Sequence, residues 1–347
     1  MAVNLPTNEL NETYCLNDRR VIFDGNRQTL YCHVAKTGST YWMRVFNIII
    51  MNLDNTNPFA LQRGLVHRDT MDKWTFEHAH TIDTSGWFKF LFVRNPFERI
   101  LSTYIDKFVS PNIYYFFIAK YMIQSERKNP NKQALECGHD IAFEEFIRAV
   151  VSKETPDEHW CPVYRICDVT NINYSFIGKM ETFVKDSEAV LHKVDKDHLI
   201  KTNTNQSETN NDILTINIKR AFDFESLRFF NGLNCSFLDF TFALQRVWKV
   251  LQLKGIIDHM QMFPFPSRIH SSVTEESFRA AVQHAVQMSF KIYSPSDLRK
   301  HVLFKAYSVL PNDLQNHFIQ HFKYDFSMFG YATILEKQKL NIEWNPF

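Results

Sequence analysis

The first clear pattern along the chain is a short apolar run that is followed by a polar turn and an amphipathic stretch. Residues 30–34 have the length and character of a buried strand, and residues 35–40 have the composition of a turn. The apolar residues that come next recur at the spacing of one helix face; they are Trp42, Val45, Phe46 and Ile49. The pattern predicts a strand, a turn and a helix, in that order.

The same order recurs further along the chain. Residues 88–93 form a second, mostly apolar run of strand length. Asn95 is a good helix N-cap, Pro96 suits the first helical position, and apolar residues from Phe97 to Phe108 then follow one helix face. Two strand–turn–helix units predict a parallel sheet that is covered by helices.

The rest of the chain gives coarser predictions. Helices are expected at 141–152, 180–193 and 311–323, a strand at 172–178, and loops at 153–171 and 201–212. Residues 222–245 are rich in phenylalanine without a clean period. We expect those rings to lie in a core rather than to form a sugar platform.

Composition and charge narrow the class of protein. Among 347 residues, 39 Lys and Arg stand against 38 Asp and Glu, so the formal net charge is +1. This balance argues against a nucleic-acid partner, because such proteins usually carry a basic excess, although a local cationic pocket is still allowed. The aliphatic run 48–51 is far shorter than the roughly 20 residues that span a membrane, and no signal peptide is visible.

Other features favour a secretory compartment. Four N-x-[S/T] sequons occur, at Asn11, Asn173, Asn205 and Asn234. The six cysteines contain no C-x-x-C pair, which disfavours a zinc ribbon or a thioredoxin-type site. These cysteines are Cys15, Cys32, Cys137, Cys161, Cys167 and Cys235. One to three disulfides are expected, and their pairing stays open.

The turn after the first strand is suited to hold an anion. Backbone N–H groups at a helix start point toward a ligand, and the helix dipole favours negative charge there. Gly38 allows the backbone to approach closely, and Lys36 adds a full positive charge. Ser39 and Thr40 add hydroxyl donors. The loop is too short for an ATP or GTP P-loop, and the alternative is an ordinary capped turn between a strand and a helix.

The end of the second strand carries matching chemistry. Arg94 lies at the edge where open α/β sheets bind ligands, and Ser102 lies two helical turns further on. Two adjacent strand ends, each with a cation and hydroxyl groups, suit a ligand with two separated phosphates. The alternative for Arg94 is a structural ion pair with a carboxylate such as Glu98.

These segments resemble a known family. RNPFERILSTYIDKF resembles the 3′-phosphate-binding segment of the Golgi carbohydrate sulfotransferases, in the chondroitin 4-sulfotransferase and HNK-1 sulfotransferase group, and AKTGSTYWMRV resembles that group's 5′-phosphosulfate loop. Later blocks follow in the same order; they are FEEFIRAVV, DEHWCPVYRIC, NYSFIGKMETFVKDSEAVL and YDFSMFGY. Together the blocks cover about half of the chain.

The resemblance implies a three-layer α/β sandwich with a P-loop-like nucleotide-binding sulfotransferase fold and the donor 3′-phosphoadenosine 5′-phosphosulfate (PAPS), without a metal. The 5′-phosphosulfate would contact Ala35, Lys36, Thr37, Gly38, Ser39, Thr40 and Tyr41. The 3′-phosphate wall would comprise Arg94, Asn95, Pro96, Phe97, Glu98, Arg99, Ile100, Leu101 and Ser102, with Arg94 and Ser102 as its ligands.

The resemblance also implies an acceptor and a location. The acceptor would be a glycan, either a glycosaminoglycan of the chondroitin type or the terminal sugar of a glycoprotein. The family resides in the Golgi lumen or membrane. Its members carry an amino-terminal membrane anchor, which is not visible here, so a secreted or truncated form is an alternative.

The chain departs from the family pattern at several positions. Ala35 replaces the usual proline, and Tyr41 stands where asparagine is usual. Family members often have two cysteines after the His-Trp block, and only the first, Cys167, is present here. Cys161 is the alternative disulfide partner for it. The predicted organisation is an amino-terminal segment at 1–27, a core with the nucleotide site at 28–204, an unmatched insertion at 205–300, and the last part of the core at 301–347.

The acceptor hydroxyl needs a general base as it attacks sulfur, and a well-placed base contributes about 10²–10⁴-fold. His80 is the first candidate, because it and His78 precede the second strand, where a related heparan-type group has a similar His-x-His. His159, in the His-Trp block, is an alternative base or an acceptor contact. Lys36 is also expected to stabilise charge on the leaving phosphate.

Two other interpretations stay open. One is a phosphotransferase with a related loop, which the missing P-loop spacing and the lack of an obvious Mg²⁺ carboxylate disfavour. The other is a non-catalytic glycan-binding descendant. Lys89, Arg99 and Lys107 are expected on a solvated helix face or strand edge.

Overall fold

The computed structural model describes most of the chain and divides it into two compact units. The residues described are 15, 21–51, 53, 57–62, 66, 73–74, 84–194, 206–230, 232, 235–266, 272–290, 292–336 and 342–347. The first unit comprises the described residues within Met1–Arg99, Pro156–Thr209 and His321–Ala332. The second comprises those within Ile100–Thr155, Asn210–Gln320 and Thr333–Phe347.

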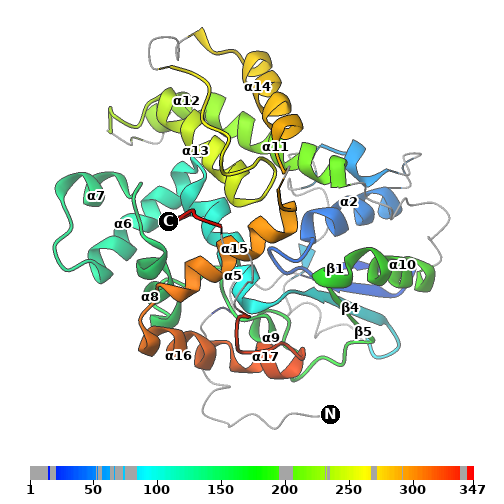
Figure 1. Cartoon of the computed structure of the whole chain (residues 1–347). Coiled ribbons are helices and arrows are strands. Elements are labelled where there is room, and N and C mark those ends of the chain that lie inside the picture. The colour runs from blue at the N-terminus through cyan, green and yellow to red at the C-terminus, as the bar shows by residue number, and fades with distance from the viewer. Residues whose placement is uncertain are drawn as a thin grey trace. The chain divides into compact units, whose positions relative to one another are not determined.

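A five-stranded mixed sheet forms the centre of the first unit (Figure 1). Its strands are β1 (Val21–Asp24), β2 (Thr29–Cys32), β3 (Lys73–Trp74), β4 (Phe88–Val93) and β5 (Phe176–Lys179). They lie in the order β3-β1-β2-β4-β5. The pairs β2–β4 and β4–β5 are parallel, whereas β1 pairs antiparallel with β2 and β3. The two predicted strand–turn–helix units thus supply the parallel centre of the sheet.

The sheet is covered on both faces, as the alternation of its side chains requires. Tyr31, Phe90 and Phe92 pack against α2 (Ser39–Ile50) and α10 (Phe183–Lys193) in one apolar cluster. The intervening residues of β2 and β4 face a second cluster, which includes α9 (Val163–Ile166) and residues at the end of α17 (Lys323–Met328). The residues of β2 and β4 in that cluster are Leu30, Cys32, Leu91 and Val93. The predicted three-layer α/β fold is confirmed.

Three disulfides pair all six cysteines. Cys15 bonds Cys161 and Cys32 bonds Cys167 in the first unit, at sequence separations of 146 and 135. In the second unit, Cys137 bonds Cys235. Cys161 therefore does not replace the missing family cysteine as the partner of Cys167, which pairs with β2 instead.

The second unit is helical. Its elements are the end of α5 (Pro96–Tyr104), a π-helical turn (Ile105–Val109), α6 (Ile113–Glu126), α7 (Lys132–Cys137), α8 (Phe143–Ser152), α11 (Gln206–Phe222) from residue 210 on, α12 (Phe224–Phe230), α13 (Phe240–Leu253), α14 (Glu275–Met288), α15 (Pro295–Ser308) and α16 (Asn312–His321) up to residue 320. The predicted helices near 141–152 and 311–323 are confirmed as α8 and α16. The helix expected at 180–193 is confirmed as α10 with a short 3₁₀ turn before it.

Two loop predictions were wrong in part. Residues 206–212, which were expected to be a polar loop, form the first turns of α11. The later turns of this helix bury Leu214, Ile218 and Ala221 in the core of the second unit, and this packing outweighs the weak helix propensity of the polar start. The predicted loop 153–171 contains the short helix α9.

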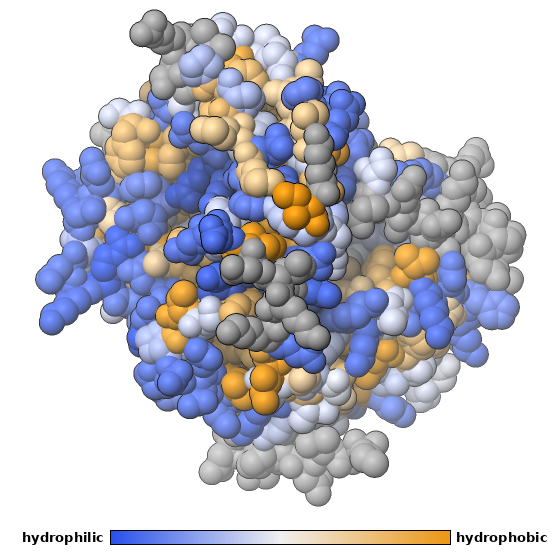
Figure 2. Space-filling view, viewed as in Figure 1, coloured by the Kyte–Doolittle hydropathy of each residue, from blue (hydrophilic) through white to orange (hydrophobic). Residues whose placement is uncertain are grey.

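The phenylalanine-rich segment contributes to the core only in part. Phe224 is fully buried, and Phe222, Phe240 and Phe242 pack against the same cluster. Phe229, in contrast, is 90% exposed. On the face drawn in Figure 2, hydrophobic residues, in orange, lie in patches among hydrophilic residues, in blue. None of the helices in the described ranges has the combined length and apolar character that crossing a bilayer requires.

Gly178 tests the packing between β4 and β5. It lies opposite Phe92 in the register, and an added Cβ would come within 2.5 Å of that ring. Gly178→Ala is expected to lower the free energy of unfolding by about 1–3 kcal/mol through overpacking, as measured by urea denaturation. Gly86→Ala is the control, since its Cβ would meet nothing within 4 Å. Equal stability of the two variants would contradict the packing described.

Candidate functional site

The carboxyl ends of three parallel strands lie at one edge of the sheet, and each brings a cation to that edge. β2 leads into the turn that holds Lys36, β4 is followed by Arg94, and β5 ends at Lys179. The register pairs Val93 directly with Lys179. Sequence analysis identified the first two cations and missed Lys179, although a lysine that closes an apolar strand is the same signal as Arg94.

The backbone of the first turn has the geometry of an anion-binding loop. Lys36 and Gly38 both have positive φ angles, of 69° and 78°. Gly38 is the N-cap of α2 and, as a glycine, supplies no capping side chain, so an anion there would meet the helix dipole without competition from a cap oxygen of this residue. A left-handed lysine costs conformational energy and is typical of functional loops. An added Cβ at Gly38 would lie 2.4 Å from the ring of Phe183.

Side chains of this turn alternate between the interior and the surface. Ala35, Thr37 and Ser39 are buried, and the Thr37 hydroxyl donates to the carbonyl of Val34 at 2.9 Å. The intervening Lys36, Gly38 and Thr40 are half-buried. Tyr41 packs edge-on against Phe183, with ring centroids 5.2 Å apart, inside the α2 cluster. Of the predicted loop contacts, those half-buried positions are therefore the best placed for a ligand.

Helix α5 orders the second predicted segment. The side chain of Asn95 accepts from the N–H of Phe97 at 3.0 Å, which confirms the predicted cap. The buried positions of the segment are Pro96, Phe97, Arg99, Ile100 and Leu101. The half-buried positions are Arg94, Asn95, Glu98 and Ser102. Glu98 and Ser102 are four residues apart on α5 and so lie on one face of this helix, whereas Arg94 precedes the helix and reaches Glu98 through its side chain.

Arg94 makes the ion pair that was considered as its alternative role. Its Nη2 lies 3.1 Å from Glu98 Oε2, and its Nε donates to the same oxygen at 3.1 Å. Arg94 is 25% exposed and Glu98 is 39% exposed, and exposed pairs of this kind are weak. The pair therefore orients the guanidinium without excluding a ligand.

Glu181 links the β4 and β5 ends to the carboxyl-terminal part of the unit. One of its oxygens accepts from the N–H of Asn95 at 3.0 Å, and the other accepts from the hydroxyl of Tyr331 at 2.9 Å. Lys179 Nζ lies 4.6 Å from the centre of the Tyr331 ring. Burial, and then the charge of Glu181, raise the pKa of Tyr331, so this hydroxyl stays protonated and donates.

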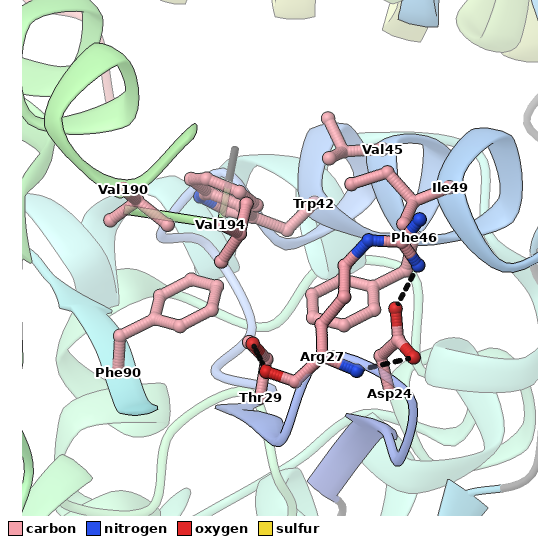
Figure 3. Close-up of a pocket in the computed structure, with 10 residues that line it drawn as sticks. All are labelled: Asp24, Arg27, Thr29, Trp42, Val45, Phe46, Ile49, Phe90, Val190 and Val194. Atoms are coloured by element: carbon pink, nitrogen blue, oxygen red, sulfur yellow. Dashed lines mark hydrogen bonds and ion pairs between the residues drawn. The ribbon is translucent and has the colours of Figure 1, made fainter. Parts of the chain in front are cut away.

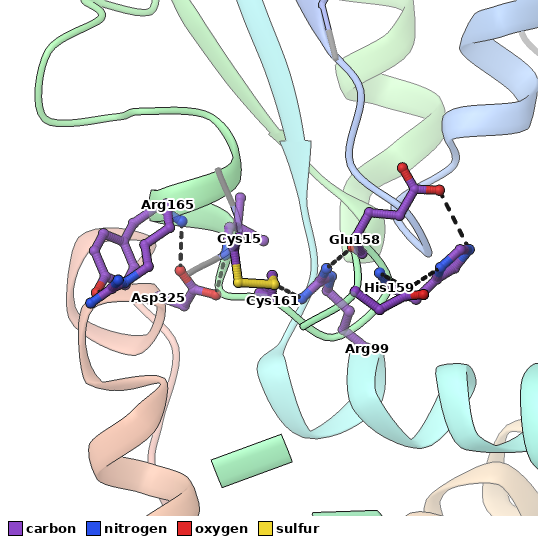
Figure 4. Close-up of a disulfide and its surroundings, with 10 residues drawn as sticks. Cys15, Arg99, Glu158, His159, Cys161, Arg165 and Asp325 are labelled. Atoms are coloured by element: carbon purple, nitrogen blue, oxygen red, sulfur yellow. Dashed lines mark hydrogen bonds and ion pairs between the residues drawn. A yellow bond between two sulfur atoms is a disulfide. The ribbon is translucent and has the colours of Figure 1, made fainter. Parts of the chain in front are cut away.

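Arg99 and Lys107 are not on a solvated face, contrary to the prediction. Arg99 is only 1% exposed, and burial lowers its pKa to about 10. Its guanidinium donates to the backbone carbonyls of Cys161 at 2.8 Å and Glu158 at 3.1 Å (Figure 4). A third bond goes to the carbonyl of Ala35 at 3.1 Å. In the second unit, Lys107 is buried with its Nζ 4.5 Å from the centre of the Tyr115 ring.

Among the three candidate bases, His159 alone lies within the described residues, whereas His78 and His80 lie outside them. His159 Nδ1 is 2.6 Å from Asp157 Oδ1, and its backbone N–H donates to the same oxygen at 2.8 Å. Its Nε2 is 3.9 Å from Glu158 Oε1. An aspartate on Nδ1 fixes the ring and favours the tautomer with a basic Nε2.

Asp325 anchors the segment that follows His159. Its two carboxylate oxygens accept from the N–H groups of Val163 at 2.8 Å and Tyr164 at 2.9 Å, at the start of α9. The side chain is fully buried, and this burial raises the pKa of Asp325 to about 6, although both N–H donors and the charge of Arg99 act in the opposite direction.

The apolar cavity of Figure 3 lies away from these groups. Its lining residues are Asp24, Arg27, Thr29, Trp42, Val45, Phe46, Ile49, Phe90, Val190 and Val194. Thr29 begins β2, so the cavity reaches the opposite end of the strand from Lys36. Its charged residues, Arg27 and Asp24, pair with each other at 2.6 Å. The cavity therefore lacks the chemistry that an anionic ligand needs.

Comparisons with known proteins identify a family and several relatives of this chain. Residues 19–227 match the model of the sulfotransferase family. The chain is 30% identical to carbohydrate sulfotransferase 11 of Rattus norvegicus over 185 residues, and 33% identical to carbohydrate sulfotransferase 8 of Homo sapiens over 181 residues. Each match covers 50% of this chain, and 52% and 42% of those proteins. The chain thus spans about half the length of these curated relatives, and no solved structure matches it significantly.

The raised pKa of Asp325 predicts a pH-dependent stability. A folded-state pKa near 6, above the ordinary value of 3.8, means that protonation favours the folded state. This contribution is complete below about pH 4 and is lost as the pH rises through 6. The free energy of unfolding of the wild type, relative to Asp325→Asn, is expected to fall by up to about 3 kcal/mol between pH 4 and pH 7.

Urea denaturation of both proteins across this pH range measures the difference. The asparagine side chain of the variant does not titrate, so other groups cancel in the comparison. If the difference instead grows with pH, the two N–H donors outweigh burial and the Asp325 pKa is lowered.

Proposed function

The chain belongs to the sulfotransferase family, and on this premise we propose that it is a carbohydrate sulfotransferase. It would transfer a sulfuryl group from PAPS to a hydroxyl of a glycan. The observation that carries the proposal is the pair of adjacent parallel strand ends, one leading to Lys36 and the other to Arg94. Family membership implies a sulfonate donor. PAPS is a donor of this kind with two separated anionic groups, one for the strand end that leads to Lys36 and one for the strand end that leads to Arg94.

The residues present fit this donor. The start of α2, whose N-cap is a glycine, and the half-buried Lys36 offer N–H groups and a positive charge for the 5′-phosphosulfate. Arg94, which follows β4, and Ser102, which lies on α5, are the proposed ligands of the 3′-phosphate. The remaining positions of the segment, Pro96 to Leu101, would then act through packing, apart from the half-buried Glu98, which orients Arg94.

When bound, the donor supplies a sulfuryl group whose bond to the 5′-phosphate oxygen breaks as a bond to the acceptor oxygen forms. Lys36 would stabilise the charge that remains on the phosphate. His159, with Nδ1 held by Asp157, would take the proton of the acceptor hydroxyl at Nε2. His80 and His78 remain the other proposed bases.

The proposed acceptor is a glycosaminoglycan, of the chondroitin type, or the terminal sugar of a glycoprotein. The proposed location is the Golgi lumen. Three disulfides support an oxidising compartment of this kind. The relatives' names support the carbohydrate class alone, so the sugar and the hydroxyl position have to come from assays with a panel of acceptors.

Nucleotide binding tests the proposal first. Adenosine 3′,5′-bisphosphate, the product of PAPS, is expected to raise the melting temperature of the wild type, because a ligand at about 100 times its Kd adds about 2.7 kcal/mol. Lys36→Ala and Arg94→Ala should reduce that shift and lower transfer of radiolabelled sulfate to glycans, by about 10²–10³ in kcat for Lys36. Lys132→Ala, whose side chain is 86% exposed on α7, is the charge-matched control.

Three outcomes would contradict the proposal. Stabilisation by ATP instead of the bisphosphate would favour a phosphotransferase. Glycan binding without any nucleotide effect would favour a non-catalytic glycan-binding protein. Folded Lys36→Ala and Arg94→Ala variants with full donor binding and transfer would remove the proposed site.

The role of His159 gives a second test. His159→Ala is expected to lower kcat for sulfate transfer by about 10²–10⁴ while the affinity for adenosine 3′,5′-bisphosphate is unchanged, because the imidazole acts on the acceptor. His284→Ala, at an exposed position of α14, is the control. Unchanged kcat in His159→Ala would move the role of base to His80 or His78.

A further inference from the structure

Arg99 joins the two segments that hold the proposed donor contact and the proposed base. It extends from α5 into the interior, where its Nε reaches the carbonyl of Ala35 and its Nη2 reaches that of Glu158, both at 3.1 Å. Each of these carbonyls belongs to the residue directly before one with a proposed function. Ala35 precedes Lys36, the proposed donor contact, and Glu158 precedes His159, the proposed base. One side chain therefore fixes the backbone next to both groups.

The third bond of Arg99 ties the same segment to a cross-link. Nη1 donates to the carbonyl of Cys161 at 2.8 Å, and Cys161 is bonded to Cys15 (Figure 4). Two residues after Cys161, the N–H of Val163 donates to the carboxylate of Asp325. The backbone around His159 is thus held on one side by a buried guanidinium and on the other by a buried carboxylate.

The three acceptors require a guanidinium rather than any cation. Arginine presents its N–H groups in a rigid plane, so the directions to the three carbonyls are fixed relative to one another. Lysine has one nitrogen on a flexible stem and cannot reach three separated acceptors in that plane. Arg99 therefore fixes the position of the Ala35 carbonyl relative to the Glu158 carbonyl.

We propose that Arg99 is a positioning residue that sets the place of Lys36 relative to His159, and that it does not contact the nucleotide. This inference rests on the proposed function of those two groups. It assigns Arg99 a role different from the 3′-phosphate wall that the family resemblance implies. The left-handed backbone of Lys36 is the kind of costly conformation that such a tie would maintain.

Arg99→Lys in the full chain tests the proposal. The variant keeps the charge and loses the planar fork, so kcat for sulfate transfer is expected to fall at least tenfold, with a smaller loss of affinity for adenosine 3′,5′-bisphosphate. Arg127→Lys is the matched control. Arg127 also makes several bonds, to Glu145 at 2.6 Å and to Asp140 at 3.0 Å in the second unit, and its replacement should lower the melting temperature without changing kcat.

An Arg99→Lys protein that is folded at the assay temperature and has wild-type kcat would overturn the inference. So would an equal loss of kcat in both variants, because that would indicate a general effect of lost stability.

Hydrogen exchange of the wild type gives a test that does not depend on a variant. If Arg99 couples the two segments, adenosine 3′,5′-bisphosphate should slow amide exchange in 157–162 as well as in 35–40. Protection of 35–40 alone would contradict the coupling and leave the proposed function intact. Absence of any protection or thermal shift would instead reject the proposed function.

Discussion

Parallel pairing of β4 with both β2 and β5 is the constraint on which the site depends. Parallel strands point in one direction, so the residues that follow them meet at the same edge of the sheet. In this chain, Lys36 and Arg94 come after β2 and β4, and Lys179 is the last residue of β5. No local preference would gather three cations from positions so far apart in sequence. Burial of the two sheet faces stabilises the pairing that brings them together.

The elements next to this edge are held mainly by backbone groups. Arg99 bonds three carbonyls, Asp325 accepts from two N–H groups, and Glu181 accepts from the N–H of Asn95. Bonds to backbone fix the path of the chain and leave other side chains available for ligands. Arg99 and Asp325 are buried, and a buried polar group without a hydrogen-bond partner is costly. Other paths of the backbone, which would leave these side chains unpaired, are therefore disfavoured.

Sequence patterns predicted the parts of the fold that depend on local periodicity. The runs at 30–34 and 88–93, the Asn95 cap and the helices α2, α5, α8, α10 and α16 follow from spacing alone. The buried side of α11 and the position of Arg99 did not, because both depend on partners that are distant in sequence. An arginine on an amphipathic helix is usually solvated, and only the arrangement of 35, 158 and 161 around it reverses that expectation. The disulfide pairing depended on tertiary structure in the same way.

The first unit is assembled from three separate stretches of chain, and the last of them contributes Asp325. During synthesis on a ribosome, the strands and α9 emerge more than a hundred residues before this carboxylate. Until then the N–H groups of Val163 and Tyr164 lack their native acceptor. The first unit can therefore reach its final form only after the stretch that carries Asp325 has emerged, so its α9 segment is completed late although its own residues are made early.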